Sequence, residues 1–309
     1  MLSNSVYNMY ENMDMLKDKI NYCLDNSDLE DIFNKLASIK GPTAICGVGG
    51  SSVVSVFLVK VLSNKNGIIA DEIMPRDMLY RPLDGYQNVI ACSYSGGNIG
   101  VTASFENNLN KYLFSAKPKE FADVNITYDG GKPDDSFVSI AATFMPMSIA
   151  LLYYCDGNRE VLDEILNSDL DFDVTDELVY EVMSGYESYT GAKMLESTLC
   201  ESGCGAALIH DKYNYCHGRG TYNYHNHNSL IYFRSHNELE YVFARPLEEL
   251  YKNIIYIDNK YQDNVINDFY CTYMALKLCV KIAQLKGKDI SRVEVSDFSE
   301  EIYVFKGNM

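Results

Sequence analysis

The chain has 309 residues, of which 47% are apolar, and it carries a net charge of −17. The length predicts two globular domains of about 150 residues each, and the apolar fraction is ordinary for domains with buried cores. An acidic surface repels nucleic acid and anionic membrane, so neither is expected as a partner. A small anionic ligand stays compatible with this charge, because backbone amides can hold it inside a pocket.

The nine cysteines are spread along the chain without the dense spacing of a disulfide framework. The first residues do not have the pattern of a signal peptide, and we expect none. The longest apolar run, 140–154, is too short to span a bilayer and contains Pro146, so it predicts a core helix. We therefore expect a cytoplasmic protein with reduced thiols.

Residues 1–40 are predicted to form helices that precede a first domain at 41–155. Within this domain strand and helix patterns alternate, which predicts a parallel sheet with helices on both faces. The expected strands are 43–46, 68–72, 88–92, 111–115 and 124–127. The expected helices are 51–62, 99–109 and 137–154.

Residues 156–177 include nine acidic residues and are predicted to form a short helix and an acidic linker. Asp169, Asp171 and Asp173 have the spacing of a calcium-binding loop. However, Val174 and Tyr180 stand where that loop needs glycine and glutamate. A solvated linker is therefore favoured over a calcium site.

A second domain is predicted at 178–309, where strand and helix patterns alternate again. The expected strands are 178–183, 229–234, 253–258 and a closing strand at 301–305. The expected helices include 189–200 and 263–285. The two halves are thus predicted to be similar α/β domains, although no literal sequence repeat is visible.

A glycine-rich turn, GVGGSS at 47–52, follows the first predicted strand. Glycines let the backbone approach a ligand closely, and the helix that follows presents free N–H groups at its start. A dinucleotide fingerprint needs glycine where Ser52 stands, and the G-K-[ST] of a Walker loop is absent. A phosphate group needs only amides and hydroxyls, so this turn is a candidate phosphate loop, with a plain tight turn as the alternative.

A second loop, CSYSGGN at 92–98, also ends a predicted strand and opens a helix. The carboxyl ends of parallel strands meet at one edge of a sheet, where open α/β sheets bind ligands. The two loops together therefore predict one phosphate site. Its predicted residues are Gly49, Gly50, Ser51, Ser93, Ser95, Gly96 and Asn98, with Ser52 as a candidate further contact.

The pair of loops, GVGGSS followed by CSYSGGN, resembles the sugar isomerase (SIS) domain family. In that family the second loop usually ends in threonine, and Asn98 takes its place here. The resemblance implies an α/β fold made of two flavodoxin-like three-layer αβα SIS domains with parallel sheets. It also implies that the partner is a small-molecule phosphosugar.

The second half is similar, from 184 to 218, to the second SIS domain of the isomerase part of glucosamine-6-phosphate synthase. In that family a histidine follows a glutamate by 16 residues, as His217 follows Glu201. The resemblance implies that Glu201 moves a proton between C1 and C2 of the sugar. It implies that His217 assists ring opening from a neighbouring subunit, which predicts a homodimer. Arg219 is a candidate further substrate contact.

Two lysines of that family are missing from this chain. Thr198 stands at the first position, and 299–302 hold no lysine at the second, although Lys306 follows. An imine-based amino transfer is therefore not favoured. We expect a sugar-phosphate isomerase that needs no cofactor; the alternatives are a non-catalytic phosphosugar sensor and a deaminase or lyase acting on an amino-sugar phosphate.

All five histidines fall between residues 210 and 236. His225 and His227 are two residues apart and would share one face of a strand, which is compatible with a metal site. However, no carboxylate lies among residues 218–237 to complete the ligand set. A polar loop is favoured, and no metal is expected.

Overall fold

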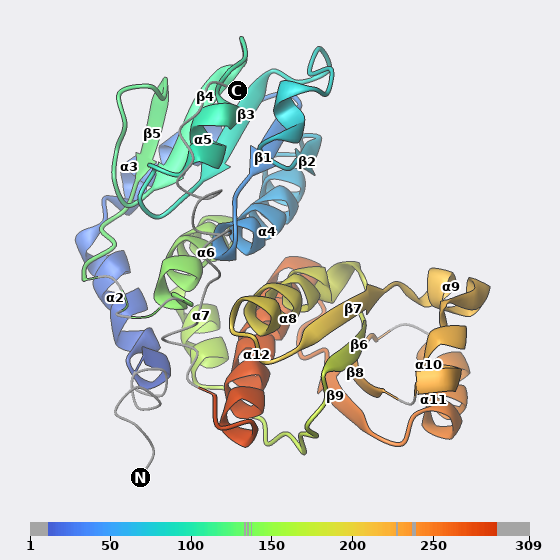
Figure 1. Ribbon diagram of the computed structural model, residues 1–309. Coiled ribbons are helices and arrows are strands. Elements are labelled where there is room, and N and C mark those ends of the chain that lie inside the picture. The colour runs from blue at the N-terminus through green and yellow to red at the C-terminus, as the bar shows by residue number, and fades with distance from the viewer. Residues whose placement is uncertain are drawn as a thin grey trace. The chain divides into compact units, whose positions relative to one another are not determined.

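The computed structural model divides into two compact units, and the division falls between residues 159 and 160 (Figure 1). It describes residues 12–132, 134, 136, 138–226, 228–236 and 239–288. The predicted strand at 301–305 and Lys306 lie outside these residues. The domain limits expected from the sequence stay predictions, and each unit is described by itself.

The first unit is built on a five-stranded parallel sheet in the order β2-β1-β3-β4-β5. Every residue of β1 and β3 is buried, as expected for strands that are covered on both faces. The order is that of the flavodoxin-like doubly wound fold. The strands are β1 (Thr43–Cys46), β2 (Ala70–Glu72), β3 (Asn88–Cys92), β4 (Asn110–Ser115) and β5 (Val124–Thr127).

Helices cover both faces of this sheet, so the unit has three layers (Figure 1). α4 and α6 pack against each other on one face, and α5 and the 3-10 turn η1 pack on the other. α6 is almost entirely buried and contains Pro146, as the sequence predicts. The helices are α2 (Leu16–Asn26), α3 (Leu29–Ser38), α4 (Gly50–Lys65), η1 (Asp77–Leu79), α5 (Ile99–Ser104) and α6 (Ala141–Tyr154).

The second unit repeats this topology with four parallel strands in the order β7-β6-β8-β9. Its four strands are thus arranged like the strands β2-β1-β3-β4 of the first sheet. β7 is not predicted from the sequence, because it is a partly exposed edge strand without a long apolar run. The strands are β6 (Val179–Met183), β7 (Ala206–His210), β8 (Ser229–Arg234) and β9 (Ile254–Asp258).

Helices lie on both faces of the second sheet as well, with α8 and α12 on one face and α11 on the other (Figure 1). The backbone N–H of Thr190 donates to buried Asp268 at 3.0 Å, and the Thr190 hydroxyl donates to the same carboxylate, which ties the start of α8 to α12. No described helix is both long and apolar enough to cross a membrane. The helices are α7 (Arg159–Leu166), η2 (Tyr186–Ser188), α8 (Tyr189–Glu201), α9 (Lys212–Asn214), the π-helical turn η3 (Tyr215–Arg219), α10 (Thr221–Asn226), α11 (Leu239–Leu250) and α12 (Asn264–Leu285).

The acidic segment that precedes β6 is paired with two lysines of α12 and with Lys286, which directly follows this helix. Lys277 lies 2.7 Å from Asp169, and Lys281 and Lys286 pair with Asp171 and Asp176. The carboxylates are exposed, so each pair stabilises the fold by at most about 1 kcal/mol. Two of the three aspartates with calcium-loop spacing, Asp169 and Asp171, therefore pair with lysines.

The α11 face of the second sheet buries a polar cluster made of Glu181, His210, Tyr215 and Tyr251. Glu181 is fully buried on the central strand β6, and the Tyr251 hydroxyl donates to its carboxylate at 2.7 Å. The Tyr215 and Tyr251 hydroxyls are 2.7 Å apart, and His210 Nε2 lies 3.4 Å from Glu181. Burial raises the pKa of Tyr251 and, together with the neighbouring Tyr215 and Glu181, keeps its hydroxyl protonated as a donor. Tyr251 thus supplies a hydrogen bond to this buried carboxylate, and the Asn228 side-chain nitrogen donates another at 3.5 Å.

We expect Tyr251→Phe to lower the free energy of unfolding by about 1–3 kcal/mol, because it removes a hydrogen bond from a buried carboxylate. Urea unfolding followed by far-UV circular dichroism measures this, since the chain has no tryptophan for fluorescence. Tyr256→Phe is the matched control, because among the described residues that hydroxyl contacts only Glu248, in an exposed hydrogen bond of 3.4 Å. Equal midpoints for the two variants would contradict the role assigned to the cluster.

Candidate functional site

The first sheet changes its winding direction between β1 and β3. These strands are neighbours, and the chain leaves them for helices on opposite faces, α4 after β1 and α5 after β3. In open α/β sheets this arrangement leaves a crevice at the carboxyl ends of the two strands. Both candidate phosphate loops lie at this crevice.

The β1–α4 loop brings its glycines close to the rest of the protein. Gly49 is the N-cap of α4, and Ser51 lies in its first turn. A Cβ on Gly50 would lie 2.5 Å from the Thr143 hydroxyl of α6, so this position has no room for a side chain. Ser52 donates its hydroxyl to the carbonyl of Gly49 at 2.8 Å and is not part of the cavity lining described below.

The β3–α5 loop is folded by its own side chains. The Ser93 hydroxyl accepts from the N–H of Gly96 at 3.1 Å, and the Ser95 hydroxyl accepts from Gly97 at 3.3 Å. Asn98 caps α5, because its side-chain oxygen accepts from the N–H of Gly100 at 2.6 Å. These bonds hold the loop in a tight turn at the end of β3.

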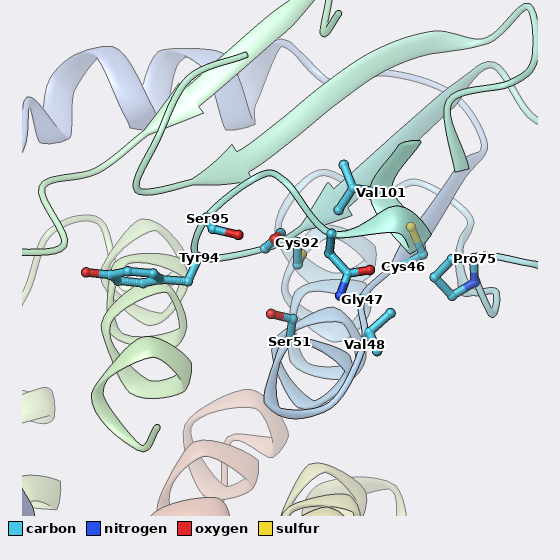
Figure 2. Close-up of a pocket in the computed structure, with 11 residues that line it drawn as sticks. Cys46, Gly47, Val48, Ser51, Pro75, Cys92, Tyr94, Ser95 and Val101 are labelled. Carbon is cyan, nitrogen blue, oxygen red and sulfur yellow. The ribbon is translucent and has the colours of Figure 1, made fainter. Parts of the chain in front are cut away.

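The two loops line one cavity of about 160 Å³ (Figure 2). Figure 2 shows Ser51 at the start of α4 and Ser95 on the β3–α5 loop, on opposite sides of the same space. None of the residues that line the cavity is charged. They are Cys46, Gly47, Val48, Ser51, Pro75, Cys92, Ser93, Tyr94, Ser95, Asn98 and Val101. The volume is below the roughly 300–1,000 Å³ of sites for drug-sized ligands, so the cavity has room for a smaller group.

Several lining residues are not among those predicted. Cys46 and Cys92 stand at the ends of β1 and β3, and burial raises the pKa of each thiol to about 12, so both are protonated. Tyr94 lies within the predicted loop, and its hydroxyl donates to the carbonyl of Gly130 at 3.2 Å. Pro75 follows β2 and lines the cavity because β2 lies next to β1 in the sheet.

Glu201 is the last residue of α8 in the second unit. It is half-buried, and burial raises the pKa of its carboxyl group. The Ser197 hydroxyl, one helical turn earlier, donates to Glu201 Oε1 at 2.7 Å and offsets part of this rise in pKa. A carboxylate in this environment is a stronger base than one in water.

His217 and Arg219 lie in the π-helical turn η3, after the carboxyl end of β7. Both are exposed, and Arg219 donates to the carbonyl of Ile209 at 3.2 Å. Glu201 precedes the amino end of β7, so a strand of about 15 Å separates the segments that carry the two predicted catalytic residues. Within one chain the fold does not bring Glu201 and His217 together.

The other histidines are placed in different surroundings. His210 is buried beside Glu181, and His236 is exposed at the end of β8. His227 lies outside the described residues, and His225 is in α10. In the part of the chain with described side chains, no three histidine, cysteine or carboxylate groups are close enough to hold a metal ion.

No protein-family model and no curated protein matches this sequence. Solved structures do share its fold. The tagatose-6-phosphate ketose/aldose isomerase from Escherichia coli superposes with a TM-score of 0.69 at 12% identity, covering 93% of this chain and 96% of the other. The predicted sugar isomerase fold is confirmed.

Two other solved structures have the same fold. The C-terminal domain of glucosamine-fructose-6-phosphate aminotransferase from Francisella tularensis gives a TM-score of 0.64 at 13% identity and covers 94% of this chain and 98% of its own. The glucosamine-6-phosphate deaminase from Thermotoga maritima gives a TM-score of 0.62 at 12% identity, and the match covers 91% of this chain and 96% of the other. At these identities the likeness concerns the fold.

Proposed function

We propose that this chain binds a sugar phosphate in the cavity between the β1–α4 and β3–α5 loops and interconverts its aldose and ketose forms. One observation carries the proposal: two glycine- and hydroxyl-rich loops, distant in the sequence, line a single cavity at the switch point of the sheet. Proteins of the same fold are named for their action on sugar phosphates.

The phosphate group is the part of the ligand that the loops suit best. Backbone amides at the start of a helix and serine hydroxyls are strong donors to phosphate oxygens. The proposed contacts are Ser51, Ser93, Ser95 and Asn98, which line the cavity, and Gly49, Gly50 and Gly96 of the same two loops, which are not among its lining residues. Binding energy from this group orients the reacting carbons, which lie at the other end of the sugar.

Isomerisation needs one base and no co-reactant. We assign the base to Glu201, which takes the proton from C2 of the open-chain aldose to form an enediolate. The proton on O2 passes to O1, and Glu201 returns its proton to C1 as the C2 carbonyl forms, so the ketose has the same atoms. The half-buried position and the raised pKa of this carboxyl group support the assignment. His217 is assigned to ring opening: the imidazole takes the proton of the C1 hydroxyl and delivers a proton to the ring oxygen as the bond between C1 and the ring oxygen breaks.

We further propose a homodimer in which the partner subunit's His217 completes the site that holds Glu201. The positions of the two residues at opposite ends of β7 support this, because one chain alone keeps them apart. Arg219 would then accompany His217 toward the ligand. The nine cysteines are free thiols, which supports the expected cytoplasmic location.

Two other functions use the same cavity. A sensor would bind the sugar phosphate without turnover, and Thr198 in place of a family lysine favours it. A deaminase would begin with the same proton abstraction from an amino-sugar phosphate, and the likeness to the Thermotoga maritima enzyme favours it.

Calorimetric titration with hexose, pentose and amino-sugar phosphates, followed by proton NMR in deuterium oxide, separates these functions. Binding together with deuterium uptake at C2 is expected for the isomerase. Binding without uptake would identify a sensor, and release of ammonia a deaminase. The proposal is wrong if no sugar phosphate binds more tightly than the matching free sugar.

A further inference from the structure

The phosphate cavity has no charged lining residue, although its proposed ligand is strongly anionic. A phosphate ester carries about −1.5 to −2 charges at neutral pH, and the whole chain carries −17. Hydroxyls and amides solvate such a group but do not neutralise it. A cation beside the loops would therefore add binding energy that the lining residues do not provide.

Lys119 is fixed at its backbone close to the β3–α5 loop. It belongs to the connection between β4 and β5, at the same edge of the sheet. Its N–H donates to the side-chain oxygen of Asn125 at 2.8 Å, and the Asn125 side-chain nitrogen donates to its carbonyl at 3.0 Å. This two-sided clamp sets where the lysine side chain begins.

The Lys119 side chain then runs along the glycines of the β3–α5 loop. Its Cε lies 3.0 Å from the position that a Cβ on Gly96 would occupy. Its Nζ lies 4.0 Å from the matching position on Gly97, and the Ser95 hydroxyl lies 3.9 Å from that same position. The ammonium group and the Ser95 hydroxyl thus both lie within about 4 Å of the same position at Gly97, and Ser95 lines the cavity.

Gly96 leaves the space that this lysine uses. Its φ is +62°, a conformation that favours glycine. A Cβ there would lie 3.0 Å from Lys119 Cε and 3.1 Å from both Leu113 Cδ2 and the Lys117 carbonyl oxygen. The glycine therefore serves both the turn of the loop and the approach of the lysine.

Lys119 forms no ion pair with any of the described residues, whereas Lys277, Lys281 and Lys286 of the second unit are each paired. A lysine with four rotatable side-chain bonds can turn its ammonium group to an anion on the neighbouring loop. We propose that Lys119 supplies the positive charge that holds the phosphate group of the ligand against the β3–α5 loop. This inference rests on the proposed function.

The test compares Lys119→Met with Lys117→Met, which removes an exposed lysine from the same connection. Calorimetry uses fructose 6-phosphate and inorganic phosphate as probes at 50 and 200 mM salt. We expect Lys119→Met to weaken fructose 6-phosphate binding about 10- to 100-fold, the effect of losing a hydrogen bond to a charged group. We also expect it to flatten the salt dependence and to weaken binding of inorganic phosphate. Lys117→Met should match the wild type, and Lys119→Arg should recover most of the affinity.

The outcomes separate this inference from the proposed function. If the wild type binds fructose 6-phosphate and Lys119→Met binds it within twofold, Lys119 is not the counter-charge and the proposed function stands. If the wild type binds neither probe nor any other sugar phosphate, both proposals are overturned. Thermal unfolding by circular dichroism establishes that each variant is folded, and the recovery by arginine shows that charge, not shape, is what the site needs.

Discussion

Replacing Ser51 and Ser95 together by alanine is expected to weaken sugar-phosphate binding by at least about 100-fold. Both hydroxyls border the cavity, one from each loop, and each hydrogen bond to a charged group contributes about 1.5–3 kcal/mol. The fold should be retained, because neither residue belongs to the buried core. Isothermal titration calorimetry with the sugar phosphate that binds best measures the loss.

Ser52→Ala is the matched control for this pair. Ser52 follows Ser51 directly, yet its hydroxyl donates to the carbonyl of Gly49 and does not line the cavity. Its replacement should change affinity by less than about threefold, since no bond to the ligand is lost. If the double variant binds the sugar phosphate as tightly as Ser52→Ala does, the phosphate group does not bind in this cavity.

Glu201→Gln is expected to lower kcat by about 10²- to 10⁴-fold, the usual contribution of a positioned general base. Glutamine keeps the size of the side chain and still accepts from the Ser197 hydroxyl, but it cannot take a proton. Binding of the sugar phosphate should be nearly unchanged, because the phosphate loops are intact. Deuterium uptake at C2, followed by proton NMR, measures the proton transfer directly.

Glu196→Gln is the control on the same helix, where the carboxylate pairs with Lys193 at the surface.

The pH profile adds a second test. Burial raises the pKa of Glu201, so its carboxyl group stays protonated and inactive to a higher pH than an ordinary glutamate, whose pKa is about 4.3. The acid limb of kcat should therefore lie above that value and vanish in Glu201→Gln. Unchanged deuterium uptake in this variant would assign the base to another residue.

Most strands of the two sheets are predicted from the sequence, and β7 is the exception. β1, β3, β5 and β8 begin and end at the predicted residues. β1, β3 and β8 are short, mainly apolar runs, and β5 (VNIT) alternates apolar and polar residues. The helix predicted at 99–109 ends at Ser104 instead. Asn107 ends it, since its side chain donates to the carbonyl of Ser104 at 2.7 Å and accepts from Leu109 at 2.9 Å. Such local side-chain hydrogen bonds compete with the helical hydrogen bonds of the backbone. The apolar periodicity of the sequence does not reveal helix ends that depend on a single side chain.

The two hydroxyl-rich loops at the ends of parallel strands are predictable from the residues alone, since strand ends and turn residues are local properties of the chain. By contrast, the fold places Pro75, Cys46 and Cys92 around the same cavity as these loops and Lys119 beside them. The fold also keeps Glu201 and His217 apart within one chain, at opposite ends of β7. These neighbours follow from strand order and from side-chain packing across the sheet edge, and neither is recorded in the spacing of residues along the chain.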